Sequence, residues 1–268
     1  MGVNHTLDRN VGHHILTFNG KDLREFGVHV SGENTFSAPE RDVEFISIPG
    51  RSGDLIQDNG RFLNQTVSYG CGITEDFDAN FSALKAWLQQ DAVYHRLSDS
   101  YHPDEFRLAA YLAAITPEME AYNASGRFSL EFVCKPQRYL LSGESTTRYR
   151  PASGGDSLGP ITNPTLFPSA PKVTIRDGEN ATITINGIRI TISPYKNVTH
   201  LRNITIDCEA QDCYCEGTPP TNMNAYVSFT DTDGNIAYEY PRLLPGDNTI
   251  VTTGDITYLD ITPGWWRT

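Results

Sequence analysis

The amino-acid sequence predicts a mainly β protein, with a first domain of strands that carries one α-helix and a second domain that is a β-sandwich or jelly roll. Short segments of alternating apolar and polar residues run through both halves of the 268-residue chain, which is the pattern of half-buried strands. Turn dipeptides such as Asn19-Gly20 and Asn186-Gly187 separate these segments. A single segment, TEDFDANFSALKAWLQQD, has helical spacing instead.

In the first half of the chain, strand patterns occur in four places. HILTFNGKDLREFGVHVSG contains two short apolar runs around Asn19-Gly20, which predicts a hairpin. VEFISI and RFLNQTVSYGCGI alternate on either side of residues 48–62 and predict one strand each. GRFSLEFVCKP predicts a strand with one apolar face, formed by Phe128, Leu130, Phe132 and Cys134.

The helical segment carries its apolar residues on one face, so the helix is expected to lie on a sheet. Thr74 is the expected N-cap, and acidic residues occupy the first turn. EFRLAAYLAAITPEME fits two structures, because its alanines favour a helix whereas its other apolar residues alternate as in a strand. The apolar helix face consists of Phe77, Phe81, Leu84 and Leu88.

Residues 48–62, IPGRSGDLIQDNGRF, place glycines, arginines and aspartates between two apolar stretches. A phosphate-binding P-loop needs a lysine and a hydroxyl residue after its second glycine, but Asp54 and Leu55 follow Gly53. Pro49-Gly50 and Asn59-Gly60 are turn dipeptides, and the second suits a type I′ hairpin. We therefore expect a long charged loop that joins two strands.

Composition changes along the chain predict two domains. Residues 1–14 are polar and are expected to form a disordered tail, followed by a first domain over residues 15–141. Residues 142–170 are rich in Ser, Gly, Pro and Thr, which predicts a linker or boundary. The second domain, residues 171–268, consists of short strand patterns separated by turn signals, including three in KVTIRDGENATITINGIRITIS.

The charge of the chain argues against nucleic-acid binding. The formal net charge is -12, whereas phosphate contacts require clustered cations. No apolar run approaches the roughly 18 residues of a membrane span, so no membrane contact is expected.

The five cysteines do not suggest a complete disulfide framework, because their number is odd. Cys208, Cys213 and Cys215 lie close together in DCEAQDCYCEG. Three interpretations stay open for them: a metal site, a disulfide, or unpaired thiols, of which unpaired thiols are favoured. The spacing lacks the paired knuckles or histidines of a zinc site.

No catalytic constellation can be assembled from the sequence, and no cofactor is implied, so the protein is not expected to be an enzyme. The acid pairs in HPDEF and DTDGN are interpreted first as turn formers. A nucleophile with a neighbouring base is not recognisable, since the histidines concentrate in the first half of the chain.

The order of features along the chain resembles the distal tail protein (Dit) family of siphophages, which are long-tailed bacteriophages with non-contractile tails. The first domain runs through PGRSGD, DNGRF, one helix and YHRLSDSYHPDEFRLA to FSLEFVCKPQRYL. The second opens with NPTLFPSAPKVTI, continues with ITIDCE and YPRLLPGDNTI, and ends on a tryptophan pair and Arg267. The resemblance extends from Ile15 to Thr268 and depends on this collinear order.

The resemblance implies a structural virion protein at the tail tip, assembled in the host cytoplasm. The first domain would be a β-sandwich with one helix that closes into a homo-hexameric ring, and the second would be a galectin-like β-sandwich outside it. The segment FRLAAYLAAI would be a strand. The partners would be the tail tube protein, the tail-tip or tail-associated lysin protein and, in some members, receptor-binding proteins. DNA would only pass through the lumen. The second domain leaves no room for the long arm insertions that grip receptor-binding proteins in baseplate-forming members, so the resemblance does not carry peripheral docking over to this chain. The tight cysteine cluster also departs from the family.

Two site hypotheses follow from these residues. A ring closed head to tail needs two unlike surfaces on each subunit, and a loop with both signs of charge suits such an interface. The alternative function is a carbohydrate-binding adhesin module, with Trp265 and Trp266 as the stacking residues. The interface residues would be Arg51, Asp54, Asp58 and Arg61.

Overall fold

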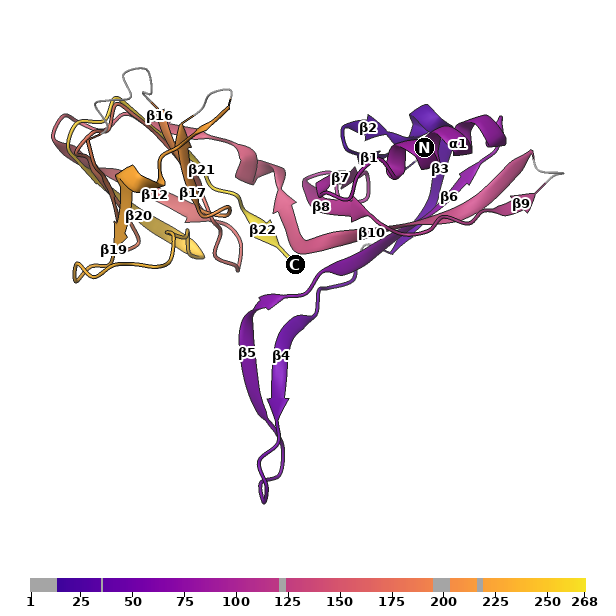
Figure 1. Ribbon diagram of the computed structural model, residues 1–268, viewed down its shortest axis with the longest axis horizontal. Coiled ribbons are helices and arrows are strands. Elements are labelled where there is room, and N and C mark those ends of the chain that lie inside the picture. The colour runs from indigo at the N-terminus through magenta and orange to yellow at the C-terminus, as the bar shows by residue number, and fades with distance from the viewer. Residues whose placement is uncertain (1–13, 35, 121–123, 195–202, 216–218) are drawn as a thin grey trace, which may run out of the picture. The chain divides into compact units, whose positions relative to one another are not determined.

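The computed structural model describes residues 14–34, 36–120, 124–194, 203–215 and 219–268 (Figure 1). The chain divides into two compact units, residues 1–138 with Thr268 and residues 139–267. The prediction of a mainly β fold is confirmed, because the described residues form twenty-two strands and a single α-helix. The expected disordered tail, apart from His14, lies outside the described residues.

A curled antiparallel sheet forms the first unit, in the order β2-β1-β7-β8-β10-β6-β3, with β9 beside β10. A bridge between His14 and Val30 brings the segment before β1 next to β3, so the sheet curls back on itself. A separate pair, β4 (Arg41–Ile46) and β5 (Leu55–Phe62), leaves this sheet. The strands are β1 (Leu16–Phe18), β2 (Lys21–Asp22), β3 (Val28–Asn34), β6 (Gln65–Ile73), β7 (His95–Asp99), β8 (Glu105–Tyr111), β9 (Glu118–Glu120) and β10 (Ser125–Leu140).

The predicted Asn19-Gly20 hairpin is present. Thr17 pairs with Asp22 and Phe18 with Lys21, and both turn residues have positive φ, 46° and 74°. Such a turn matches the right-handed twist of the strands that it joins. A short 3-10 helix (Leu23–Phe26) follows β2 and ends at Gly27, which is left-handed at φ 67°.

Helix α1 (Phe77–Leu88) packs its predicted apolar face into the core of the first unit. The expected N-cap differs, since Asp76 rather than Thr74 precedes the helix. Asp76 is left-handed, with φ 46°, and makes no side-chain capping bond. Instead, the Asn80 side chain donates to the Glu75 carbonyl at 3.0 Å and secures the start of the helix.

The core of the first unit lies between α1 and the paired strands β6 and β10. Their register runs from Gly126 opposite Ile73 to Cys134 opposite Gln65. The predicted apolar face of β10 is buried, and the Phe132 ring packs against the rings of Phe18 and Tyr111 at 5.0 and 5.4 Å. Burial of each large side chain stabilises the fold by roughly 1.5–3 kcal/mol.

The ambiguous segment FRLAAYLAAI contains strand β8, as the resemblance implied. Almost every residue of β8 is buried, including Glu105 and Arg107. Glu105 pairs with Arg138 at 2.5 Å, with the two side chains 3% and 13% exposed. Burial lowers the pKa of Arg107.

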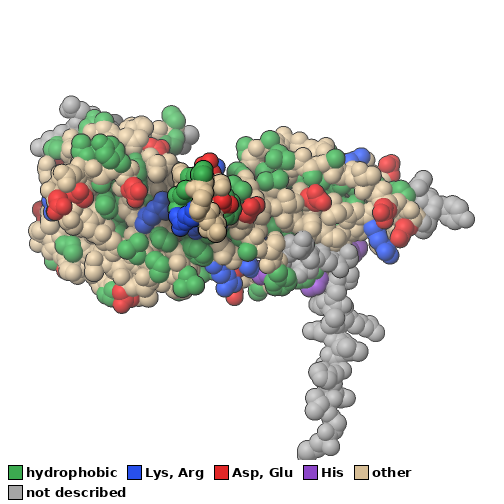
Figure 2. Space-filling model, turned by 90° about the horizontal axis from the view of Figure 1, so that it is seen from below, with side chains coloured by type: hydrophobic (Ala, Val, Ile, Leu, Met, Phe, Trp, Pro, Cys, Tyr) green, Lys and Arg blue, Asp and Glu red, His purple; other side chains and the backbone are tan. Residues whose placement is uncertain are grey.

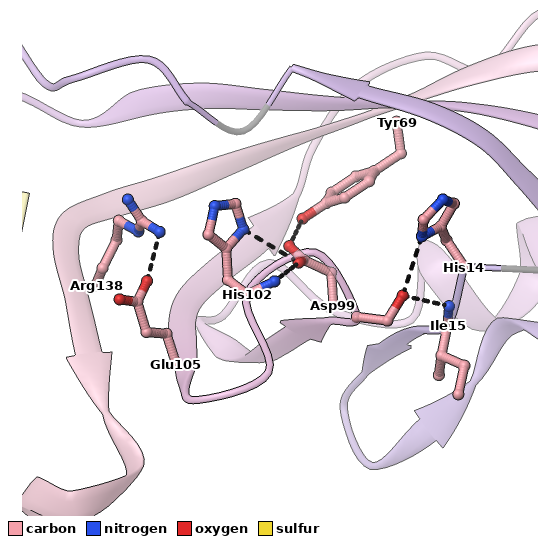
Figure 3. A network of polar contacts seen from close by, with 8 residues as sticks. His14, Ile15, Tyr69, Asp99, His102, Glu105 and Arg138 are labelled. Carbon is pink, nitrogen blue, oxygen red and sulfur yellow. Dashed lines mark hydrogen bonds and ion pairs between the residues drawn. The ribbon is translucent and has the colours of Figure 1, made fainter. Parts of the chain in front are cut away.

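A polar network holds the connection between β7 and β8 (Figure 3). Asp99 accepts hydrogen bonds from the Tyr69 hydroxyl at 2.7 Å and the His102 backbone N–H at 2.9 Å. The Ser100 hydroxyl accepts the Ile15 N–H at 3.0 Å. Burial raises the pKa of Tyr69, so the phenol stays a donor to Asp99 at neutral pH. The network fixes the loop against the start of β1.

Two antiparallel sheets form the second unit, with a shared core of aliphatic residues. The six-stranded sheet has the order β11-β21-β13-β16-β17-β18, and the five-stranded sheet β12-β20-β14-β15-β19. The strands of these two sheets are β11 (Thr147–Tyr149), β12 (Gly155–Asn163), β13 (Lys172–Arg176), β14 (Thr182–Ile185), β15 (Ile188–Ile192), β16 (Asn203–Asp207), β17 (Asp212–Cys215), β18 (Thr221–Asn222), β19 (Val227–Thr230), β20 (Gly246–Thr253) and β21 (Tyr258–Thr262). A further short strand, β22 (Trp266–Arg267), belongs to neither of them.

The segment expected to be a linker, residues 142–170, differs from that expectation. It contains a 3-10 helix (Leu141–Glu144), β11 and β12, and it belongs to the second unit. Strand β12 pairs along β20 with an irregularity between Leu158 and Ile161. Strand β12 lies at the edge of its sheet and contains a bulge, and such a strand tolerates Pro160 and two glycines. The composition of this segment therefore resembles that of a linker.

We predict that Glu105→Ala destabilises the first unit by about 3–5 kcal/mol, because Arg138 is left buried without its carboxylate partner. Urea unfolding of the full chain measures the change. The double variant Glu105→Leu/Arg138→Met removes both charges and is expected to lose less stability than the single variant. Equal losses for the two variants would contradict this account of the pair.

Candidate functional site

The hairpin of β4 and β5 is the candidate functional site. The two strands pair only with each other, and Figure 1 shows them projecting from the first unit. Strand β5 begins at Leu55 within the segment expected to be a loop, so the connection is limited to residues 47–54. Gly50 and Gly53 in this connection have φ of 81° and 82°, which glycine adopts without strain.

The Asn59-Gly60 dipeptide does not form the hairpin turn that its sequence predicted. Both residues lie within β5, and Gly60 has φ 73°. The register shifts here, with Arg41 opposite Phe62 and Val43 opposite Asp58. The dipeptide therefore produces a β-bulge, which also uses the positive φ of glycine.

Two of the four predicted interface residues form ion pairs inside the hairpin. Asp58 pairs with Arg41 at 2.5 Å, and Arg61 pairs with Asp42 at 2.6 Å. The hydrogen bond from Arg41 holds the pKa of Asp58 below its usual range, and that from Arg61 does the same for Asp42. These charges connect the two strands across the bulge.

The other two predicted interface residues, Arg51 and Asp54, lie in the exposed connection at the tip. Within the described residues, neither side chain forms a hydrogen bond or ion pair. The Arg51 backbone N–H donates to the Ile48 carbonyl at 3.1 Å and tightens the turn. The structure therefore divides the four residues into two that pair inside the hairpin and two whose charges lie at its tip.

Apolar residues on both faces of the hairpin were missed by the sequence reasoning. Phe45 opposes Ile56 on one face, and their exposed fractions are 64% and 62%. Ile46 opposes Leu55 on the other face, at 37% and 46%. Figure 2 views the molecule from the side of the hairpin tip and shows hydrophobic side chains among the charged ones. The sequence does carry a signal for this surface, because Phe45 and Ile46, and likewise Leu55 and Ile56, are apolar at consecutive positions and therefore lie on opposite faces of a strand.

The three clustered cysteines lie in the core of the second unit as free thiols. Burial raises the pKa of Cys213 to about 11 and raises that of Cys208 as well, so these thiols are protonated at neutral pH. Cys213 and Cys215 share one face of β17. Among the described residues, no group of three or more His, Cys, Asp or Glu side chains is placed to hold a metal.

Trp265 is buried, and Trp266 is half-buried with one ring face covered. Trp265 is 6% exposed and belongs to the core of the second unit. Trp266 stacks on Phe167 with ring centroids 4.5 Å apart and donates its indole N–H to the Pro168 carbonyl at 3.0 Å. Their placement corresponds to core and edge packing rather than to sugar stacking.

A groove of about 400 Å³ lies over β6 and β10 in the first unit. Glu118 and Arg127 line it together with small residues such as Gly70 and Ser129. Cys71 also lines it, but burial raises the pKa of this thiol to about 12. A nucleophile with an adjacent base does not occur among these lining residues. No described helix is long and apolar enough to cross a membrane.

Comparison with solved structures identifies the architecture. No model of a known protein family matches the sequence, and no curated protein matches it. The crystal structure of the Dit protein of phage SPP1 superposes with a TM-score of 0.63, 13% identity, and coverage of 93% of this chain and 98% of that chain.

The chain has the fold of a Dit protein. A chain of the phage p2 baseplate in its calcium-activated conformation is also similar, with a TM-score of 0.50, 9% identity, and coverage of 94% and 97%. The Dit fold therefore extends over both units, and the sequence resemblance is confirmed at the level of the fold.

We predict that Arg41→Ala raises the pKa of Asp58 toward its unperturbed value of about 3.9. The pKa of Asp58 is lower in the folded hairpin than in the unfolded chain, so its pair with Arg41 stabilises the hairpin at pH values above the unfolded pKa. This stabilisation is lost as the pH falls through the folded pKa of Asp58. Carbon-detected NMR titration of the Asp58 carboxyl measures the change. Arg61→Ala is the matched control and should act mainly on Asp42; an unchanged Asp58 titration in Arg41→Ala would contradict the prediction.

Proposed function

We propose that this protein is a structural component of a siphophage virion, the distal hub that joins the tail tube to the tail tip or baseplate. The observation that carries the proposal is the likeness to the SPP1 Dit protein across 93% of the chain. That SPP1 protein is a paradigm of the hub adsorption apparatus in phages that infect Gram-positive bacteria. The likeness covers both units of the chain. It supports a shared role more strongly than a likeness to a single β-sandwich would, because such a sandwich occurs in proteins of many functions.

The hairpin supports assembly into a ring. An isolated two-stranded hairpin is marginally stable in water, and this one exposes Phe45 and Ile56 on one face and Ile46 and Leu55 on the other. Exposed apolar patches on both sides of one element mark an interaction surface. Neighbouring copies on both sides of the hairpin would cover them.

A homo-hexamer closed by head-to-tail contacts meets this requirement. Such contacts are heterologous, so one surface of each subunit meets a different surface of the next. The hairpin would contribute to both surfaces, with one apolar pair facing each neighbouring copy and Arg51 and Asp54 at its tip. The internal pairs of Asp58 and Arg61 keep the strands in register for that contact.

The ring would contact the tail tube protein on one side and the tail-tip or tail-associated lysin protein on the other. The ring would lie at the virion tail tip, and any receptor-binding proteins would dock at its periphery. Assembly would take place in the host cytoplasm. DNA would pass through the lumen without binding, because an acidic protein does not provide the cations that release phosphate counterions. No catalytic role is part of this proposal.

We predict that wild-type protein forms six-fold rings as its concentration rises, and that Phe45→Asp/Ile56→Asp remains monomeric. The two aspartates would place charge in the apolar contact, which is unfavourable unless the charge is paired. Light scattering across a concentration series and negative-stain images give the result. Deletion of residues 50–53 is expected to weaken the ring as well.

Val251→Asp is the matched control, since Val251 is an exposed strand residue of the second unit, 41% exposed. This variant should form rings like the wild type. Rings in Phe45→Asp/Ile56→Asp, or loss of rings in Val251→Asp alone, would contradict the assignment of the hairpin as the ring interface.

A further inference from the structure

The tip of the hairpin, residues 47–54, is slender and open to solvent. Every residue of this connection is exposed, and a Cβ atom added at Gly50 or Gly53 would meet no other atom within 4 Å. Arg51 and Asp54 are the two charged residues of the connection. Among the described residues, no ion pair involves either of them, so both charges are available to a partner.

The hairpin carries this tip away from its own sheet. Strand β5 has eight residues, which extend about 26 Å at roughly 3.3 Å per residue. Figure 1 shows both strands of the hairpin leading away from the rest of the first unit. The tip therefore points away from the surfaces of its own unit and toward whatever molecule lies beside it.

The groove of about 400 Å³ in the first unit has an acidic and a basic residue on its wall. Glu118 of β9 opposes Arg127 of β10 directly across the strand pair, and both side chains are exposed. Directly opposed Cβ atoms lie about 4.5–5.5 Å apart, so the two charges form one compact site. Gly70 opposes Ser129 in the neighbouring strand pair, and the small size of both residues leaves the groove open here.

The charges beside the groove are only partly paired within the chain. Arg127 pairs with Glu120 at 3.4 Å, and the two side chains are 74% and 49% exposed. A pair as exposed as this one contributes little to stability and rearranges readily. Glu118 takes part in no ion pair with the described residues. Two acids and one base leave a net negative charge at this rim, which favours an incoming cation.

We propose that the groove over β6 and β10 receives the hairpin tip of a neighbouring copy, with Arg51 beside Glu118 and Asp54 beside Arg127. This contact rests on the proposed ring and names the surface on which each tip lies. The tip offers a base and an acid, whereas the groove offers an acid and a base, so each charge meets its opposite. The glycines beside Arg51 allow the tip to enter without a bulky neighbour.

The arrangement of charge favours a copy of this chain as the occupant. The formal net charge is -12, so two copies repel each other over most of their surfaces. A local match of opposite charges then fixes where two copies meet. A nucleic acid would need several unpaired cations, but the rim offers Arg127 alone beside Glu118 and Glu120.

Charge reversal on the full chain tests the contact. Arg51→Glu and Glu118→Arg each bring like charges together and are expected to raise the concentration at which rings form by about ten-fold or more. Arg51→Glu/Glu118→Arg restores opposite charges and is expected to form rings at a lower concentration than either single variant. The control Arg51→Glu/Asp104→Arg has the same net charge, reverses an exposed acid outside the groove, and should not recover.

Disulfide trapping tests the same contact without depending on ring formation. The five native cysteines are buried free thiols, so cysteines placed at exposed positions react first. A mixture of Arg51→Cys and Glu118→Cys proteins of different tag length is expected to give a covalent heterodimer with a mild oxidant, which takes one hydrogen from each thiol as the S–S bond forms. Asp104→Cys in place of Glu118→Cys is the control and should give no heterodimer.

Failure of Arg51→Glu/Glu118→Arg to recover, or absence of the Arg51→Cys/Glu118→Cys heterodimer, would overturn this contact. Circular dichroism melting confirms that each variant is folded. Wild-type rings together with either failure would remove this inference alone and leave the hub in place. The heterodimer without six-fold rings in the wild type would support the contact and contradict the hexameric hub.

Discussion

The antiparallel pairing of β6 with β10 is the interaction on which most of the structure depends. It joins the aromatic core of the first unit, in which Tyr69 and Phe132 are buried, to the strand that leaves that unit at Arg138. The hairpin chain returns to the sheet through Gln65, the first residue of β6. A one-residue slip of this pairing would turn the buried side chains of β6 outward. The register therefore secures both the core and the base of the hairpin.

The hairpin itself is held by polar contacts and lacks a core. Arg41 and Arg61 each reach an aspartate of the opposite strand, and Gly60 allows the bulge that brings them there. Surface ion pairs of this kind contribute little to stability individually. Apolar residues on both faces remain exposed in the single chain, so the element is suited to a partner rather than to isolation. The exposure of these apolar side chains is the physical reason for proposing that neighbouring copies cover the hairpin in a ring.

Buried polar groups elsewhere act as structural supports. Glu105 and Arg138 neutralise each other in the interior, and Asp99 ties Tyr69 to the loop before β8. In the second unit, Asn248 is fully buried, and the two N–H bonds of its side-chain amide are shared among three carbonyl oxygens, those of Ile161, Leu244 and Gly246. A buried amide with all its hydrogen bonds formed fixes the loops around it.

The sequence by itself determined the elements whose causes are local. Alternation identified the strands around Phe132, Asn19-Gly20 identified a hairpin, and the spacing from Phe77 to Leu88 identified the helix, because period and turn chemistry act over a few residues. Collinear order of motifs was enough to indicate the Dit fold.

Tertiary structure decided the rest: residues 155–163 form strand β12 because β20 offers them a partner, and Asn59-Gly60 forms a bulge because the longer hairpin continues past it. It also decided that Trp265 is buried, that Glu105 meets Arg138, and that Phe45 and Ile56 meet on an exposed face. Each of these outcomes depends on pairing between residues distant in sequence or on burial by other elements, which local patterns do not encode.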